Sequence, residues 1–225
     1  MIAEESKENF YWRSILFKPR ETPTKLNLTA KELKYNFKSE IDSRFIAEEH
    51  HHFYGKPWCL GRDQFNYLKN LGLKPRDYFL DLGCGALRAG IWLIDFLAPS
   101  RYFGIDAHLK SLEAAVYYEI PLHNLEKKYP RILWDNSFSI AHFGIQFDWI
   151  LAHSLFIHLA PEEIDIALKN IASNLNKDGC LVFNGVLPLP EKELKRHYKL
   201  ALANRENQKF SFIEGSIEWF ELRLI

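Results

Sequence analysis

The fold is decided by residues 78–88, which read Tyr78-Phe79-Leu80-Asp81-Leu82-Gly83-Cys84-Gly85-Ala86-Leu87-Arg88. The apolar run up to Leu82 predicts a short buried strand. Gly83 and Gly85 allow a sharp turn and a close approach of the backbone to a ligand. Arg88 begins a predicted helix over residues 88–97. A strand, a glycine turn and a helix in this order are typical of a parallel α/β sheet, which binds its ligands beyond the carboxyl ends of its strands.

The same alternation continues along the chain. Further strands are predicted over residues 102–106, 132–134, 147–152 and 180–184, and helices over 63–71, 108–118 and 161–175. Residues 176–179 predict a turn and residues 191–204 a charged helix. Two closely linked strands, near 209–213 and 218–224, predict an antiparallel edge pair. The predicted fold is α/β, a doubly wound, mostly parallel sheet of seven strands.

The N-terminal region differs from this pattern. It is rich in Lys and Glu, and Leu33, Phe37 and Ile41 follow a helical spacing of four. Its aromatic side chains, among them Phe10 and Trp12, need apolar surface to cover them. We expect residues 1–60 to form a helical arm that acts as a lid, and residues 61–225 to form the Rossmann-like domain.

Composition limits the class of protein. A chain of 225 residues with 47% hydrophobic residues can bury a full core, which excludes disorder of the whole chain. Lys and Arg number 29, as do Asp and Glu, and this neutral balance argues against a nucleic-acid partner. The acidic start is unlike a signal peptide, and the longest apolar stretch, residues 90–98, is too short for a membrane span. We expect a cytoplasmic protein with no membrane partner. The oligomeric state stays open.

The cysteines and histidines do not predict a metal site. Cys59, Cys84 and Cys180 are far apart and form no pair with the spacing of zinc ligands. The run at residues 50–52 is His-His-His, but adjacent side chains point in different directions, and a solvated helix end explains the run equally well. The sequence therefore predicts no metal.

Two carboxylates lie near the carboxyl ends of predicted strands, at the ligand-binding edge. Asp106 ends the second strand, where a carboxylate can accept both hydroxyls of a ribose. Asp81 suits a ligand that carries an ammonium group. Either residue alone could instead be a helix cap or a turn residue. A nicotinamide-dependent oxidoreductase, the alternative enzyme class, would need a glycine where Arg88 stands.

The motif at residues 79–85 resembles the first motif of the class I S-adenosylmethionine-dependent methyltransferases. Residues 103–106, Phe-Gly-Ile-Asp, resemble the acidic end of their second strand. Residues 147–152 resemble their fourth-strand motif, and residues 175–182 the turn into their fifth strand. The resemblance covers about residues 60–186. It departs from the family at Leu87, which stands where a third glycine is common.

The resemblance implies S-adenosylmethionine as the cofactor and S-adenosylhomocysteine as the product. Asp81 would face the amino-acid end of the cofactor, Gly83 and Gly85 would lie against it, and Asp106 would hold its ribose. The full set of implied cofactor-binding residues is Asp81, Gly83, Cys84, Gly85, Arg88, Asp106, Ala107, His108, Asn136, Ser137, Phe138 and Ala152. Asn136, Ser137 and Phe138 are expected near the adenine.

The residues after the fourth strand are expected to line the reaction centre. His153 is the candidate general base, because an imidazole can take a proton near neutral pH. It could instead only line the cofactor site. Candidate substrate-binding residues are Tyr54, Trp58, Arg62, His153 and Phe156. Tyr54 and Trp58 could equally serve packing. His158 is interpreted as a packed structural residue.

These observations predict a methyltransferase that acts on oxygen or nitrogen of a small molecule, which by family analogy alone would be a specialised metabolite. A non-catalytic partner subunit that keeps the cofactor pocket is the other hypothesis, because methyl transfer requires no single obligatory residue.

Overall fold

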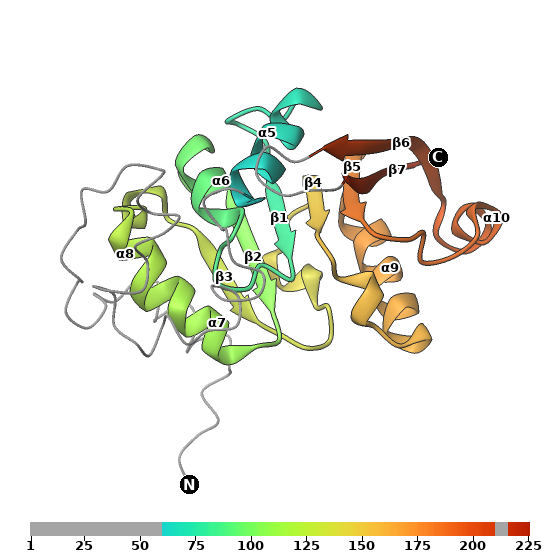
Figure 1. The fold of residues 1–225 in the computed structure, drawn as a ribbon. Helices are drawn as coiled ribbons and strands as arrows, with labels where there is room; N and C mark the ends of the chain where they lie inside the picture. The colour runs from blue at the N-terminus through green and yellow to red at the C-terminus, as the bar shows by residue number, and fades with distance from the viewer. Residues whose placement is uncertain (1–59, 210–215) are drawn as a thin grey trace, which may run out of the picture. The chain divides into compact units, whose positions relative to one another are not determined.

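The computed structural model of the chain describes residues 60–209 and 216–225. The strands of this part form a seven-stranded sheet in the order β3-β2-β1-β4-β5-β7-β6 (Figure 1). The pairs β1–β4, β2–β3 and β4–β5 are parallel, whereas β5–β7 and β6–β7 are antiparallel. The predicted α/β fold with an antiparallel edge pair is confirmed.

The chain packs as two compact units. Among the described residues, the first comprises 60–76 and 84–134, and the second 77–83, 135–209 and 216–225. Each is described by itself. The predicted arm over residues 1–60 lies outside the described residues apart from Leu60, and the predicted division at residue 61 stays a prediction.

The first unit holds strands β2 (Tyr102–Asp106) and β3 (Arg131–Trp134) with the helices around them. These are α5 (Arg62–Asn70), α6 (Gly90–Phe96), α7 (Leu109–Ala114), the π-helix η2 (Ala115–Glu119), α8 (Ile120–Leu122) and the 3-10 helix η3 (Glu126–Lys128). Phe65 of α5 packs edge-to-face on Phe96 of α6, with ring centroids 5.3 Å apart, and the Lys69 ammonium covers both rings.

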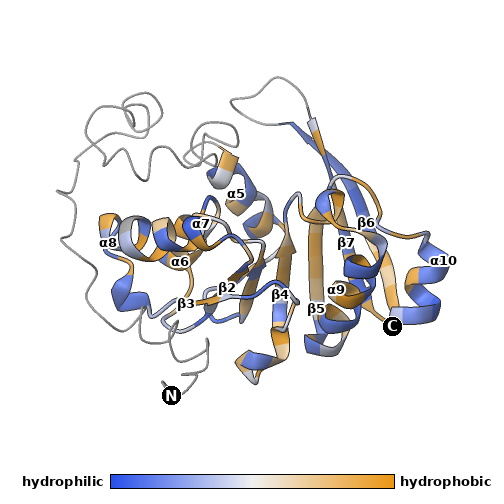
Figure 2. Ribbon diagram, turned by 90° about the horizontal axis from the view of Figure 1, so that it is seen from below, coloured by the Kyte–Doolittle hydropathy of each residue, from blue (hydrophilic) through white to orange (hydrophobic). Residues whose placement is uncertain are grey.

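The second unit holds the remaining strands: β1 (Phe79–Leu82), β4 (Phe147–Ala152), β5 (Leu175–Asn184), β6 (Leu200–Lys209) and β7 (Ser216–Leu224). Its helical segments are η4 (Ile140–Phe143), η5 (Phe156–His158), α9 (Pro161–Asn174), α10 (Glu191–Glu193) and η6 (Leu194–Tyr198). Figure 2 shows mainly hydrophobic residues in β5 and a two-sided pattern on α9. One face of α9 is therefore suited to cover the strands.

The amino ends of three strands meet at Asp148. Its carboxylate accepts the Tyr78 backbone N–H at 2.8 Å, just before β1, and the Asn176 amide at 2.6 Å, in β5. Asp148 itself belongs to β4, between Phe147, which pairs with Leu175, and Trp149, which pairs with Cys180. One carboxylate thus ties β1, β4 and β5 at the end of the sheet opposite to their carboxyl termini.

Two sequence predictions need correction. Residues 200–204 are not the end of a charged helix but the start of β6, because Lys199 takes a left-handed φ of 55° that ends the helical segment. Of the strand expected near 209–213, residue 209 is the last of β6, and residues 210–213 lie outside the described residues. Residues 176–179, expected as a turn, lie within β5, where the register against β4 shifts.

Among the described residues no helix has the length and apolar character that crossing a bilayer requires.

Candidate functional site

The loop that follows β1 is held against β2 by its backbone. The Cys84 N–H donates to the Ile105 carbonyl at 3.0 Å and so extends the pairing beyond the end of β1. The Cys84 side chain is buried against Gly104, where an added Cβ would come within 2.9 Å of Cys84 Sγ. Gly104, in the middle of β2, thus makes room for the Cys84 side chain.

Asp106, at the carboxyl end of β2, organises this loop. Its Oδ2 accepts the Gly85 N–H at 2.8 Å, and its Oδ1 accepts the His108 N–H at 2.7 Å. Gly85 has a φ of 53°, a conformation that glycine adopts without strain. An ionised carboxylate offers about four acceptor positions, so each oxygen of the half-buried Asp106 keeps one for a ligand hydroxyl.

The two residues that follow Asp106 are exposed at the same edge. The Trp134 indole N–H donates to the Ala107 carbonyl at 2.8 Å, which fixes the loop after β2 to the end of β3. His108 Nδ1 lies 2.7 Å from Ser111 Oγ in the first turn of α7. Ala107 and His108 thus have fixed backbones and accessible side chains.

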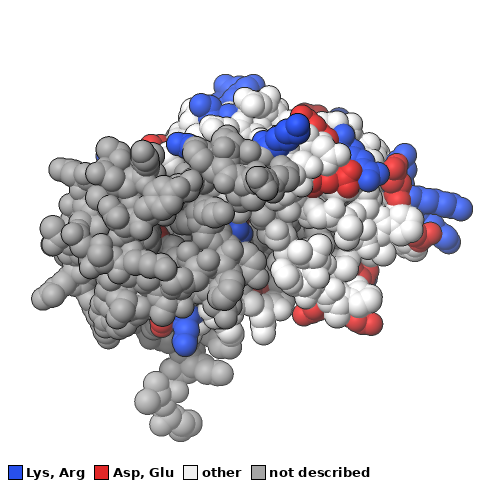
Figure 3. Space-filling view, in the orientation of Figure 1, with Lys and Arg blue, Asp and Glu red and all other residues white. Residues whose placement is uncertain are grey.

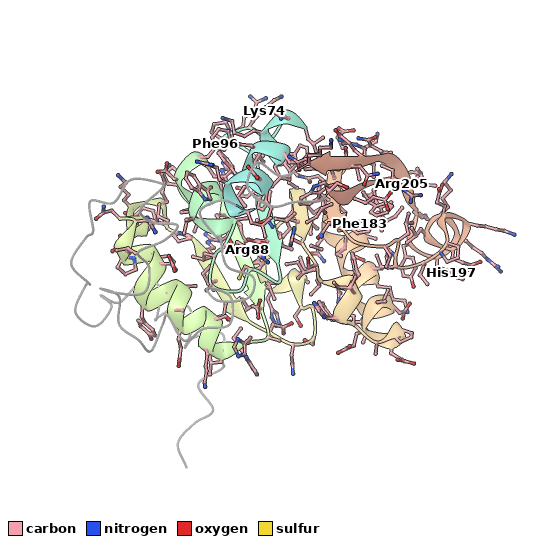
Figure 4. All side chains as sticks on the ribbon, viewed as in Figure 1. Lys74, Arg88, Phe96, Phe183, His197 and Arg205 are labelled. Carbon is pink, nitrogen blue, oxygen red and sulfur yellow. The ribbon has the colours of Figure 1, made fainter. Side chains whose placement is uncertain are left out.

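Leu87 and Arg88 complete the turn into α6. Leu87 is buried and has a φ of 63°, so a leucine takes the left-handed conformation that a third glycine would adopt easily. Arg88, labelled in Figure 4, is half-buried, and its carbonyl oxygen packs on Gly61 at the start of α5. A Cβ on Gly61 would lie 1.8 Å from that oxygen. The predicted substrate residue Arg62 is the first residue of α5 and is half-buried.

In the second unit, Asp81 and Gly83 bracket the end of β1. Asp81 is 4% exposed and pairs with Leu151 of β4. Gly83 is exposed with a φ of 82°, and an added Cβ would lie 3.3 Å from Leu155 Cδ1. Gly83 is therefore in close contact with the loop after β4.

The loop after β3 is built on Asp135, which the sequence analysis missed. Its Oδ1 accepts the N–H groups of Ser137 and Ser139 at 2.8 and 2.9 Å, and its Oδ2 accepts the Ser137 hydroxyl at 2.9 Å. Burial raises the pKa of Asp135, but these hydrogen bonds outweigh it and leave the pKa below its usual value. Of the residues predicted near the adenine, Asn136 and Ser137 are exposed on this loop, and Phe138 is half-buried with a φ of 56°.

The carboxyl ends of β4, β5 and the start of β7 bring four polar or aromatic side chains together. Ala152 ends β4 and is fully buried. Beyond it, the Ser154 N–H donates to Asn184 Oδ1 at 2.5 Å, and Asn184 Nδ2 donates to Ser154 Oγ at 3.3 Å. Ser154 Oγ lies 3.2 Å from His153 Nδ1, and the His153 ring lies 5.4 Å from that of Trp219.

The other residues discussed in the sequence analysis are buried, exposed or outside the described residues. Phe156 is 4% exposed and packs edge-to-face on Phe183, 5.2 Å between centroids, so its side chain lies in the core beneath the loop. His158 is exposed, which corrects its interpretation as a packed residue. Tyr54 and Trp58, and the histidines at 50–52, lie outside the described residues.

Ser154 lies in the stretch expected to line the reaction centre, but neither it nor Asn184 or Trp219 was predicted as a site residue. Asn184 is the last residue of β5, as Asp106 is the last residue of β2. A polar residue at this position of a parallel strand is the sequence signal that could have identified Asn184. Trp219 is placed by antiparallel pairing with Asn184, which no local pattern reveals.

Known proteins share this architecture. Residues 80–181 match the family model described as a methyltransferase domain. Magnesium protoporphyrin IX methyltransferase from Synechocystis PCC 6803, solved with bound SAM, is 17% identical over 90% of this chain and 100% of that one, with a TM-score of 0.59. TrmN from Thermus thermophilus is 19% identical over 75% of this chain, with a TM-score of 0.58, and the match spans 49% of its length. The N-methyltransferase NodS from Bradyrhizobium japonicum WM9 is 16% identical over 72% of this chain and 95% of its own, with a TM-score of 0.52.

The sheet order and the glycine turn define the fold of class I S-adenosylmethionine-dependent methyltransferases. The match of residues 80–181 to the methyltransferase domain model confirms the resemblance noted in the sequence.

Proposed function

We propose that this chain transfers the methyl group of S-adenosylmethionine to an oxygen or nitrogen atom of a small molecule. The observation that carries the proposal is the pairing of Gly85 with Asp106, which places a left-handed glycine beside a carboxylate with unused acceptor positions. Solved relatives with the same fold contain bound SAM or SAH.

The residues fit this cofactor. The ribose hydroxyls suit the remaining acceptor positions of Asp106, because hydroxyls donate to a carboxylate. Gly83 and Gly85 lack side chains where the backbone would meet the methionine part. Asp81, Cys84, Arg88, Ala107, His108, Asn136, Ser137, Phe138 and Ala152 remain proposed members of the cofactor site.

The sulfonium supplies an activated methyl group, so the protein's own task is to align the acceptor and to exclude water. His153 is the proposed proton acceptor for a hydroxyl nucleophile, or for an ammonium group that must lose a proton before the amine can attack. Arg62, Tyr54, Trp58 and Phe156 are the other proposed residues of the acceptor side, of which Phe156 would act from beneath the loop.

Charge supports a small acceptor. The segments after β4 and β5, residues 153–160 and 185–190, contain no Lys, Arg, Asp or Glu, although 26% of the chain is charged. On the face drawn in Figure 3, basic and acidic side chains of the described residues are interspersed. A polyanionic acceptor such as RNA would be expected to meet a basic stripe.

Cofactor binding tests the proposal directly. Calorimetry is expected to show binding of S-adenosylhomocysteine and no binding of NAD. Asp106→Ala is expected to weaken binding by about 1.5–3 kcal/mol, the range for hydrogen bonds to a charged group. Glu113→Ala, at an exposed position of α7, is the control and should bind normally. Unchanged affinity in Asp106→Ala would exclude the ribose assignment, and binding without turnover on any acceptor would favour the non-catalytic partner.

A further inference from the structure

His153, Ser154 and Asn184 form a chain of hydrogen bonds, and the donor and acceptor can be assigned for the Asn184–Ser154 pair. Oxygen and nitrogen of an asparagine amide are assigned from their partners. Here the Ser154 backbone N–H, which can only donate, faces Asn184 Oδ1 at 2.5 Å and so fixes the amide orientation. The Asn184 Nδ2 group, which can only donate, is then the one that faces Ser154 Oγ at 3.3 Å.

Ser154 Oγ therefore accepts from Asn184 and keeps its own proton and a second lone pair, so towards His153 it can either donate or accept. Among the described residues, the other group that faces this hydroxyl is His153 Nδ1, 3.2 Å away. When the serine donates, Nδ1 carries the lone pair of a neutral imidazole and the ring proton is on Nε2; when Nδ1–H donates to the serine, the ring proton is on Nδ1.

We propose that Asn184 and Ser154 are positioning residues that hold neutral His153 in the Nε2–H tautomer, with Nδ1 as the nitrogen that receives a proton. The role of these residues in catalysis rests on the proposed methyl transfer, whereas their hydrogen-bond geometry does not. Neither residue was predicted as a site residue from sequence, and Ser154 takes a left-handed φ of 54° that brings its N–H and hydroxyl to the same amide.

The proton then follows one route. As the acceptor atom forms its bond to the methyl carbon, the carbon–sulfur bond breaks and its electron pair stays on sulfur. The acceptor proton passes to Ser154 Oγ, which at the same time gives its own proton to His153 Nδ1. The imidazolium later releases one proton to water, which restores the starting state.

Histidine tautomers in the full chain, saturated with S-adenosylhomocysteine, test the proposal. Nitrogen NMR of ¹⁵N-histidine-labelled protein, at a pH where the rings are neutral, distinguishes protonated from unprotonated ring nitrogens. The His153 signals are assigned as those missing in His153→Gln. The wild-type ring is expected to be protonated at Nε2.

Asn184→Asp is the sharpest variant, because it keeps the acceptor for the Ser154 N–H and removes the donor to Ser154 Oγ. The serine hydroxyl should then donate to the new carboxylate, and His153 should change to the Nδ1–H tautomer. Ser154→Gly removes the hydroxyl but suits the left-handed backbone, and it should leave a mixture of tautomers. His108, whose Nδ1 faces Ser111, is the internal control and should not change.

A wild-type ring protonated at Nδ1 would overturn the proposal, as would a tautomer that stays the same in both variants. Calorimetry with S-adenosylhomocysteine on the same samples separates the two hypotheses. Lost cofactor binding in the wild type contradicts the proposed function, whereas normal binding with the wrong tautomer contradicts only the role of Asn184 and Ser154.

Discussion

Leu87 occupies a backbone conformation that suits glycine, and its buried side chain explains why a leucine is kept there. A left-handed φ costs a side-chain-bearing residue about 1–2 kcal/mol. Burying a leucine contributes about as much or more, so the side chain outweighs the strain. The absence of a third glycine therefore does not change the course of the turn.

These two effects predict that a glycine variant is more stable than an alanine variant at position 87, the reverse of the order expected within a helix. Leu87→Ala and Leu87→Gly should both destabilise the fold by about 2–5 kcal/mol, because both leave a cavity. The glycine variant should be the more stable by about 1 kcal/mol, since it alone relieves the strain. Leu93, fully buried within α6, is the control, and there the alanine variant should be the more stable. Urea unfolding measures all four variants, and the same order at both positions would contradict the prediction.

His153 carries the prediction on turnover. His153→Ala should lower turnover by about 10²–10⁴ if the ring accepts a proton in the reaction. Cofactor affinity, measured by calorimetry, should remain nearly normal. Near-normal turnover in this variant would leave alignment of the reactants as the main source of rate.

Single site residues could be predicted where a side chain able to bind a ligand stands at the end of a recognisable strand. Asp106 follows an apolar strand and was predicted, and the structure shows its bonds to Gly85 and His108. Asp135 and Asn184 were missed because their partners are set by loop geometry and by strand pairing across 30 residues.

Among the elements, α5 is joined closely to the turn after β1. Gly61→Ala should destabilise the fold by more than about 3 kcal/mol, because the new Cβ would require the backbone at Arg88 to move. The same change should weaken S-adenosylhomocysteine binding, since Arg88 belongs to the turn. Gly72→Ala is the control, with open space around it but a φ of 107°, so strain alone should cost it about 1–2 kcal/mol. Equal losses in denaturant unfolding would show that α5 adapts to the added methyl.

The elements that were mispredicted are those decided by tertiary pairing. Residues 200–209 contain Ala, Leu, Glu and Arg, which favour a helix locally, yet they form β6 along the full length of β7. Arg205 adds an ion pair to Glu218 at 2.6 Å and lies over the Phe220 ring, which stacks on Phe183; Figure 4 labels Arg205 and Phe183. Contacts of this kind arise only once β7 is in place.

For the whole chain, the alternation of strands and helices was enough to predict the class of fold. Hydrophobic period and glycine position are local signals that repeat along the sequence. The N-terminal region offers only the helical spacing of Leu33, Phe37 and Ile41, and its proposed role remains a prediction from composition.

Deleting residues 1–30 tests that role. The shortened protein should fold and bind S-adenosylhomocysteine, while turnover should fall sharply if the segment closes over the acceptor. Circular dichroism, calorimetry and a methyl-transfer assay measure the three properties. Loss of folding would make the segment part of the core, and normal turnover would make it dispensable.

The position of Asp148 has a practical consequence for engineering. Its carboxylate fixes the alignment of β1, β4 and β5 at the end of the strands that faces away from the glycine turn and the His153 loop. Loop exchanges at residues 157–160 and 185–190, which leave His153, Ser154 and the buried Phe156 in place, should therefore leave the strands aligned, since the bonds that align them are not touched. The second unit is in this sense a scaffold on which the proposed acceptor side can be varied by grafting two short segments.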